Sequence, residues 1–301
     1  MSQIDVVLGA GLIGRDLIYR LVALGHKVRV IDRKNCPNEF IGLVEWHTSD
    51  FSKLGAIGHI FAGADYIYNL MPIFPQDLNG LISRDSQTYR CSKELIELAL
   101  NYKLKGILVA SSSAVYGNQG EVTVTETSET KPLSFYGKNK LVLEDLFLSD
   151  ASDLDLKILR IANPYGVNQS FGASNGFIGI LVKKIINNEV VSITNSGNIF
   201  RDYIYITDLI EGMVRASFLG IRSSSSIYNM GGGKPYSLND VIVLSEQILG
   251  RNIQYSHAEI KHEEIIYSLL DSSLAAKDFS FQPSITFPQG LEIVFRHHGL
   301  C

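Results

Sequence analysis

The sequence predicts an α/β protein with a doubly wound parallel sheet and a smaller C-terminal substrate-binding lobe. Two observations predict this fold class. Strand-like apolar runs alternate with helix-like patterns through the first two-thirds of the 301 residues, which is typical of a parallel sheet with helical crossovers. Near the N-terminus, a strand, a glycine-rich turn, a helix and a second strand ending in a carboxylate follow one another directly. A chain of 33.3 kDa can also bury a large core.

The N-terminal elements have the layout of a dinucleotide-binding (Rossmann) unit. Ile4–Leu8 is a short apolar run that predicts a buried strand, and the helical pattern after the turn stops at Gly25. Lys27–Asp32 predicts the second strand. The glycines between them form a G-x-G-x-x-G turn, which lets the backbone approach a pyrophosphate at a helix N-terminus. The cofactor contacts expected in this turn are Gly9, Gly11, Leu12, Ile13 and Gly14.

Asp32 indicates which dinucleotide binds. It lies 18 residues after Gly14, where a carboxylate accepts hydrogen bonds from the adenosine ribose. A carboxylate there repels a 2′-phosphate, so NAD is expected rather than NADP. Arg33 beside it is counted among the expected cofactor contacts, and an arginine can accommodate that phosphate. We prefer to interpret Arg33 as a solvated loop charge.

A serine run and a tyrosine–lysine pair predict the chemistry. Tyr136 precedes Lys140 by four residues, which places both side chains on one face of a helix. A free tyrosine has a pKa near ~10, and a neighbouring cation favours the phenolate. Residues 111–113 are serines that follow the predicted strand 106–110, at the strand end where open α/β sheets bind ligands. A serine hydroxyl, a phenol and an ammonium form a proton-transfer unit for an alcohol/carbonyl pair.

Taken together, these residues resemble the extended short-chain dehydrogenase/reductase family, in particular its nucleotide-sugar epimerases, dehydratases and reductases, such as the UDP-hexose 4-epimerases. The resemblance runs through nearly the whole chain. It implies that Ser112, Tyr136 and Lys140 are catalytic, that Tyr136 and Lys140 also contact the cofactor, and that Tyr116 packs or lines the substrate wall. The further segments that carry the resemblance are residues 49–51, 64–70, 159–166, 200–208, 228–233 and 270–273.

The same resemblance implies further binding residues. Asp50 and Phe51 lie where the family contacts adenine, and Leu70 ends the strand that lines the cofactor site. Asn163 is expected at the phosphates of a sugar nucleotide, unless it only makes a turn before proline. Arg201 is expected at the diphosphate, with a structural ion pair to its neighbour as the alternative.

Three positions depart from the family pattern. Leu8 stands where the family usually has glycine, and Met71-Pro72 replaces two small residues beside the nicotinamide. An Arg-x-x-Asp pair that commonly grips the nucleotide is represented by Lys261 and Glu264, both expected to bind substrate. Lysine keeps the charge but lacks the planar fork of arginine, so the identity of the base stays open.

Two enzymatic functions follow from this resemblance. The favoured one is an NAD-dependent 4-epimerase that transiently oxidises C4 of a UDP-hexose. The alternative is an NAD(P)H-dependent reductase of a dTDP-linked 4-keto-6-deoxy sugar. A 4,6-dehydratase is disfavoured because that chemistry resembles sites with Asp-Glu directly after the catalytic hydroxyl. Ser113 and Ala114 stand at those two positions here. A non-enzymatic NAD-binding regulator is also disfavoured, because such a protein has no need of an intact set of Ser112, Tyr136 and Lys140.

Composition limits the remaining classes. The net charge of −4 and the pI of about 6.0 give no support for nucleic-acid binding. The sequence has no apolar stretch of ~18 residues and no basic-then-apolar leader, so no membrane span is expected. We expect no metal site at His297-His298. A cytoplasmic location is expected, and a homodimer is the candidate assembly. Free thiols are expected at Cys36, Cys91 and Cys301.

The alternation of elements also predicts two domains. Residues 1–166 are expected to form the NAD-binding domain, and residues 201–228 to return to it. Residues 167–200 and 229–301 are expected to form the substrate-binding lobe.

Overall fold

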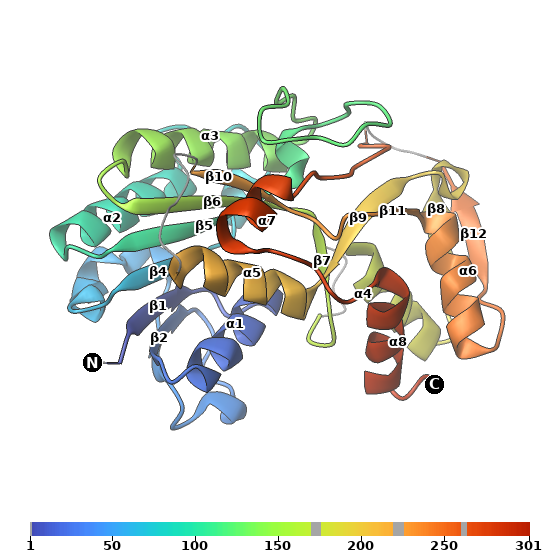
Figure 1. Ribbon diagram of the computed structural model, residues 1–301, viewed down its shortest axis with the longest axis horizontal. Helices are drawn as coiled ribbons and strands as arrows, with labels where there is room; N and C mark the ends of the chain where they lie inside the picture. Colours follow the sequence, from blue (N-terminus) through green and yellow to red (C-terminus); the bar gives the residue numbers. More distant parts are fainter. Residues whose placement is uncertain (1, 170–175, 219–225, 260–263) are drawn as a thin grey trace.

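The computed structural model describes residues 2–169, 176–218, 226–259 and 264–301. Its largest element is a parallel sheet of seven strands in the order β10-β6-β5-β4-β1-β2-β3 (Figure 1). The strands are β1 (Ile4–Leu8), β2 (Lys27–Asp32), β3 (Glu45–Thr48), β4 (Tyr66–Asn69), β5 (Gly106–Ser112), β6 (Asp155–Ile161) and β10 (Ile227–Met230). The predicted doubly wound α/β fold is therefore confirmed.

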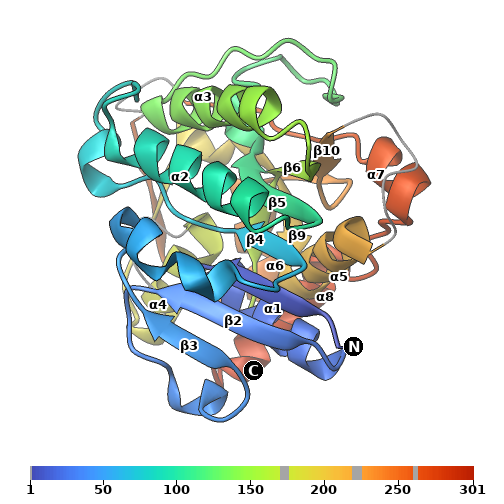
Figure 2. The same cartoon turned by 90° about the vertical axis from the view of Figure 1, so that its left-hand side faces the viewer.

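Helices cover both faces of this sheet. Figure 2 shows α2 (Gln87–Asn101) and α3 (Phe135–Asp150) on one side, and α1 (Leu12–Ala23) and α5 (Ile206–Phe218) on the other. Side chains alternate between the two faces of a strand, so neighbouring β1 residues enter different cores. Val6 packs into the core beneath α2 and α3, whereas Val7 packs into the core beneath α1.

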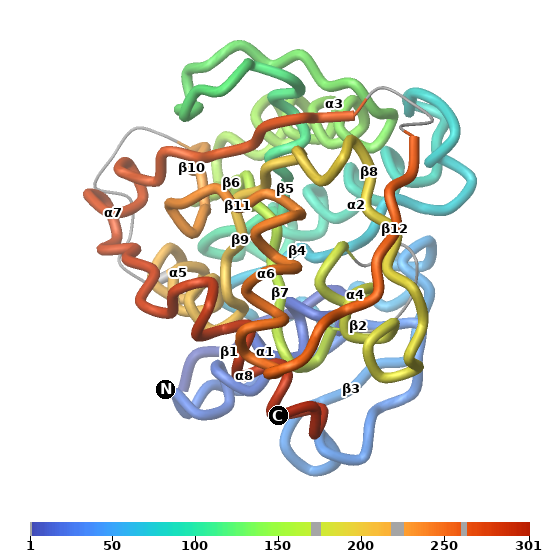
Figure 3. Tube along the Cα trace, turned by 90° about the vertical axis from the view of Figure 1, so that its right-hand side faces the viewer, coloured from blue at the N-terminus to red at the C-terminus, as the bar shows by residue number. Residues whose placement is uncertain are grey.

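Two smaller sheets follow in the second half of the described chain. Figure 3 shows β8 and β12 beside α4 and α6, and Figure 1 places β8, β12 and α6 at the end of the molecule opposite α2. One sheet has the order β11-β9-β7 and the other pairs β12 with β8. The strands are β7 (Asn163–Tyr165), β8 (Val191–Thr194), β9 (Phe200–Tyr205), β11 (Pro235–Ser237) and β12 (Tyr255–Ala258). The helices are α4 (Gly176–Ile186), α6 (Leu238–Leu249), α7 (Ser273–Phe279) and α8 (Phe287–His297).

Short 3₁₀ helices connect several of these elements. They are η1 (Asn38–Phe40), η2 (Phe51–Lys53), η3 (Gly55–Phe61), η4 (Pro75–Asp77), η5 (Ser113–Val115) and η6 (Asn195–Gly197). In the described part of the chain, every helix is too short or too polar to span a membrane. The domain limits 1–166, 201–228, 167–200 and 229–301 stay a proposal.

The strand order creates a place for a ligand. The chain winds outward from β1 in both directions, through β2 and β3 on one side and through β4, β5 and β6 on the other. Ligands of open α/β sheets bind outside the carboxyl ends of strands, where the direction of winding reverses. In this sheet, that point lies between β1 and β4.

Candidate active site

The carboxyl ends of four neighbouring strands bring most of the predicted residues to one edge of the sheet. Leu8 at the end of β1 pairs with Asn69 at the end of β4, and Ser112 at the end of β5 pairs with Ile161 at the end of β6. The glycine turn, Leu70, the 3₁₀ helix η5 and Asn163 therefore all begin at this edge. The cofactor and substrate residues come from separate segments that parallel pairing aligns.

The turn between β1 and α1 has the geometry that a dinucleotide requires. Gly9 has φ of +98°, which favours glycine, and a Cβ on Gly14 would lie 2.0 Å from the Gly9 carbonyl oxygen. Gly11 is the N-cap of α1, without a side-chain cap or an acidic residue in the first turn. A Cβ at Gly11 would meet nothing within 4 Å. The free N–H groups and the open space at this helix N-terminus fit a pyrophosphate.

The residues around this turn are arranged consistently with an adenosine site. The Asp32 carboxylate accepts hydrogen bonds from the backbone N–H groups of Ala10 and Lys34, both at 2.8 Å, which orients it toward the turn. Arg33 beside it is exposed. Asp50 caps η2 by accepting a hydrogen bond from Ser52 N–H. Hydrogen bonding from the Ser52 side chain, and to a smaller extent from its N–H, holds the pKa of the Asp50 carboxyl below its usual range, and Arg33 contributes less.

The apolar members of the predicted cofactor set support the same turn. Phe51 is buried, and Leu12 and Ile13 at the start of α1 pack against the core. Leu70 N–H donates to the Leu8 carbonyl oxygen at 3.0 Å, and a Cβ at Gly9 would come within 2.9 Å of the Leu70 carbonyl oxygen. These contacts bring the end of β4 against the glycine turn.

The structure brings Tyr136 and Lys140 together on α3. Lys140 is buried, and its Nζ donates to the Ala110 carbonyl oxygen on β5 at 2.7 Å and lies 5.8 Å from the centroid of the Tyr136 ring. Tyr136 is 41% exposed, so its phenol is accessible from solvent. Ser112 Oγ accepts from Ala114 N–H at 3.2 Å and begins η5. A Cβ on Gly137 would lie 2.6 Å from the Ala114 carbonyl oxygen, so this glycine lets α3 approach η5.

Three of the four residues predicted to bind only substrate line one pocket of about 290 Å³. They are Asn163, Arg201 and Glu264, whereas Lys261 lies outside the described residues. Arg201 donates to Glu264 at 3.3 Å and to the Ile265 carbonyl oxygen at 2.6 Å, and burial lowers its pKa. The structure pairs Arg201 with Glu264 instead of with the adjacent Asp202.

Asp202 is a buried residue to which the sequence assigned no binding role. Its carboxyl accepts hydrogen bonds from Gly232 N–H at 2.7 Å and from Leu270 N–H at 3.1 Å, and its backbone carbonyl accepts one from the Asn163 side chain at 2.9 Å. Burial raises the pKa of Asp202 to about 6. This residue ties β9 to two later segments beside the pocket.

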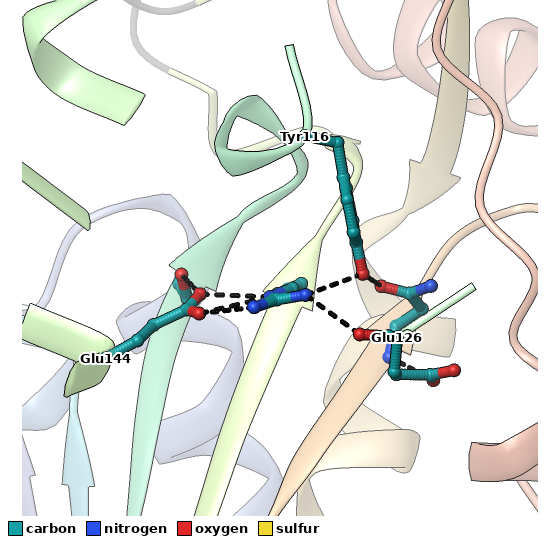
Figure 4. Close-up of polar contacts among 6 residues, drawn as sticks. Tyr116, Glu126 and Glu144 are labelled. Carbon is teal, nitrogen blue, oxygen red and sulfur yellow. Dashed lines mark hydrogen bonds and ion pairs between the residues drawn. The ribbon is translucent and has the colours of Figure 1, made fainter. Parts of the chain in front are cut away.

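A buried polar network beneath α3, the helix of Tyr136 and Lys140, was also missed. Figure 4 shows it: Arg160 on β6 forms an ion pair with Glu144 on α3, and its other side donates to the Tyr116 hydroxyl at 3.0 Å. The network consists of Ser111, Tyr116, Glu126, Glu144, Arg160 and Asn229. One local signal was available, since Glu144 follows Lys140 by four residues on the same helical face.

Comparison with known proteins identifies the family. Residues 6–231 match the NAD dependent epimerase/dehydratase family. The chain belongs to this family. It is 28% identical over 306 residues to the UDP-glucose 4-epimerase of Bacillus subtilis, covering 91% of this chain and 90% of that protein. It is also 26% identical over 298 residues to the dTDP-4-dehydro-6-deoxyglucose reductase of Escherichia coli, covering 94% and 93%.

A solved structure shows the same fold. The UDP-glucose 4-epimerase of Thermotoga maritima superposes with a TM-score of 0.87 over 99% of both chains, at 22% identity. The family membership confirms that the protein is an NAD-dependent sugar-nucleotide epimerase or reductase. The relatives include both activities, so the choice between them depends on the site.

We predict that the protein binds NAD more tightly than NADP, and that Asp32→Asn reduces this preference. The carboxylate faces the turn, where a 2′-phosphate would meet a like charge, so the expected preference is on the order of tenfold or more. Titration of both cofactors into wild type and variant measures it. Equal affinities in the wild type would contradict the role of Asp32 and would indicate that Arg33 accommodates the phosphate.

We predict that Asp202 makes stability depend on pH. Because its folded pKa of about 6 exceeds the ordinary value of 3.8, its contribution is fully present below about pH 4 and is lost as the pH rises through 6. Urea unfolding of wild type and Asp202→Asn at several pH values isolates this contribution. The free energy of unfolding of wild type relative to the variant should fall from pH 4 to pH 7, and a constant or rising difference would contradict the assignment.

Proposed function

We propose that the protein is a nucleotide-sugar 4-epimerase that transiently oxidises C4 of a UDP-hexose. The observation that carries the proposal is the placement of Tyr136 beside buried Lys140 at the end of β5. The neighbouring strand β6 leads to Asn163, which lines the Arg201 pocket. An alcohol at the catalytic edge and a diphosphate in the pocket correspond to the two ends of a sugar nucleotide.

The chain's own residues perform the proton transfer. The Tyr136 phenolate oxygen removes the proton from the sugar 4-hydroxyl, and Ser112 Oγ donates a hydrogen bond to the same oxygen. Lys140 would hold the nicotinamide ribose of bound NAD, and its positive charge would stabilise negative charge on the Tyr136 oxygen. The chemistry that bound NAD supplies is acceptance of a hydride from C4 and its return to the opposite face of the ring. Tyr136 then returns the proton, so the reaction needs no external oxidant.

The pocket supports a nucleoside diphosphate as the handle of the substrate. Arg201 supplies a positive charge for a diphosphate, and the Glu264 carboxylate beside it can accept hydrogen bonds from ribose hydroxyls. Asn163 adds an amide to the pocket lining. The Thermotoga maritima structure contains UDP-glucose, and this relationship supports uridine diphosphate as the nucleotide. A homodimer in the cytoplasm stays a prediction.

A second candidate is a reductase of a dTDP-linked 4-keto-6-deoxy sugar. The Escherichia coli relative favours it, because its identity and coverage almost equal those of the Bacillus subtilis epimerase. Ser112, Tyr136 and Lys140 would also catalyse this reaction. Tyr136 would donate the proton, and a reduced cofactor would be consumed in each turnover. Met71 and Pro72 also depart from the epimerase pattern at the cofactor wall.

We predict that Tyr136→Phe removes nearly all turnover. Loss of a positioned acid–base group should lower kcat on the order of 10²–10⁴-fold. The fold and the NAD affinity should be preserved, because the Tyr136 ring is 41% exposed and phenylalanine retains its shape. Turnover, NAD titration and thermal melting test this. Activity within a few-fold of wild type would remove Tyr136 from the mechanism.

The two candidate activities predict opposite cofactor behaviour. The epimerase should interconvert UDP-glucose and UDP-galactose, or their N-acetyl forms, without added NADH and without a change in NADH absorbance. The reductase should oxidise one NADH for each 4-keto-6-deoxy sugar nucleotide and should not act on UDP-hexoses. Chromatography of the sugar nucleotides, together with absorbance at the NADH band, measures both. Stoichiometric NADH loss with no action on UDP-hexoses would contradict the proposed epimerase and support the reductase.

A further inference from the structure

We propose that Glu144, neutralised by Arg160, is a positioning residue that holds Lys140 and the Ser111–Ser112 strand end in their working arrangement. This proposal rests on the proposed function only because the variants are compared by their enzymatic activity. Glu144 contacts neither the reacting atoms nor the substrate pocket, so its action goes through Lys140 and β5.

The first support is the shared face of α3. Tyr136, Lys140 and Glu144 are spaced four residues apart, so their side chains line one face on consecutive turns. Their exposure falls along this row, from 41% at Tyr136 to 8% at Lys140 and 1% at Glu144. The phenol is therefore open to a ligand, whereas the carboxylate at the other end is enclosed by the fold.

The second support is a pair of hydrogen bonds between consecutive turns of α3 and two consecutive residues of β5. Lys140 Nζ donates to the Ala110 carbonyl oxygen, and Ser111 Oγ donates to the Glu144 carboxylate. Ser112, the expected catalytic hydroxyl, comes directly after these two residues. The contact of Glu144 with Ser111 thus sets both the height of α3 over β5 and the position of the strand end.

The third support is the fork that holds Glu144. Arg160 Nε lies 3.1 and 3.2 Å from the two carboxylate oxygens, and Arg160 Nη2 lies 2.7 Å from one of them. Ser111, Arg160 and Asn229 pair with one another across β5, β6 and β10, so they form one row across the sheet. The Tyr116 hydroxyl, which accepts from Arg160, donates to Asn229 at 2.6 Å and continues the row of contacts.

The charges in this region suggest what the pair does electrostatically. Lys140 and Glu144 line the same small cavity of about 20 Å³, and they are its only titratable lining residues among those described. Arg160 from β6 balances Glu144, and the ionisable groups beyond Arg160 are Tyr116 after η5 and Glu126 in the following loop. The uncharged polar side chains that β4 and α2 contribute to the cavity are Asn69, Thr88 and Ser92. Because Arg160 balances Glu144, the Lys140 charge beside the Tyr136 ring is not offset by this carboxylate.

Single variants of the pair should move the pH profile in opposite directions. Glu144→Gln leaves the Arg160 charge unbalanced and favours the Tyr136 phenolate, so the acid limb of kcat should move to lower pH. Arg160→Gln leaves the carboxylate unbalanced beside Lys140, so that limb should move to higher pH. Each shift should be about half a unit or more, and kcat should fall between about 10-fold and 100-fold because the reacting groups are misplaced. The double variant should regain the wild-type pH position with a reduced kcat.

A matched control is available on the same strand. Lys157 and Asp155 form another largely buried ion pair, at the opposite end of β6. Asp155→Asn should lower the melting temperature without moving the pH profile. If Glu144→Gln and Arg160→Gln shift the profile in the same direction, or only lower the melting temperature as the control does, the positioning role is wrong. If Arg160→Gln does not fold, the other two variants decide. A shift of the kcat pH profile in Glu144→Gln that disappears in the double variant supports the proposal. A shift that is still present in the double variant overturns it.

NAD titration separates this proposal from the proposed function. Glutamine offers one acceptor atom where the carboxylate offers two, so Ser111 or Arg160 loses a partner in Glu144→Gln, and β5 and Lys140 shift. NAD binding should then weaken about 3-fold or more, whereas Asp155→Asn should bind as wild type does. If the wild type processes neither UDP-hexoses nor 4-keto sugars, the proposed function has failed, and this titration alone decides. Equal NAD affinity in both variants would then overturn the positioning role.

Discussion

The buried guanidinium of Arg160 is the constraint on which the packing of α3 against β5 and β6 depends, and with it the position of the proposed catalytic residues. A charge inside a protein must be paired and hydrogen-bonded, and Arg160 is only 4% exposed. Glu144 on α3 meets it from one side and Tyr116 from the other, so the helix cannot slide along the sheet without leaving a charge unpaired. The proposed catalytic pair Tyr136–Lys140 lies on the same helix. Its placement therefore follows from a contact that takes no part in the chemistry.

The parts of the fold that were predictable are those determined by neighbouring residues. The first two strands were predicted at the bounds that the structure shows, because a short apolar run bounded on one side by glycine is a local pattern. The glycine turn and the Tyr136–Lys140 pair were equally visible, since both depend on spacings of a few residues. The strand expected at 106–110 continues to Ser112, because its pairing with β6 continues to Ile161. That extension depends on a partner strand whose paired residues lie 49 positions later in the chain.

The parts that were not predictable depend on residues far apart in the sequence. Asn229 is fully buried and reaches Tyr116, which lies 113 residues earlier, and nothing in either local segment marks that contact. The same holds for Asp202, whose carboxyl binds the backbone of Gly232 and Leu270. The resemblance placed Arg201 and Glu264 at the substrate, but their ion pair became visible only when β9 and residue 264 were brought together.

The two halves of the site are held by different constraints, and this separation suggests how one catalytic unit can serve different sugar nucleotides. The proton-transfer residues are fixed by the packing of α3 on β5 and β6. The pocket around Arg201 is fixed by Asp202, which anchors segments near residues 232 and 270 through their backbone N–H groups. Because backbone contacts do not depend on side-chain identity, Glu264, which lines the pocket, can change without disturbing this anchor. Changes there would alter which nucleotide and sugar bind, while Tyr136, Lys140 and Ser112 keep their positions. Such independence is consistent with a family whose members include an epimerase and a reductase of similar identity to this chain.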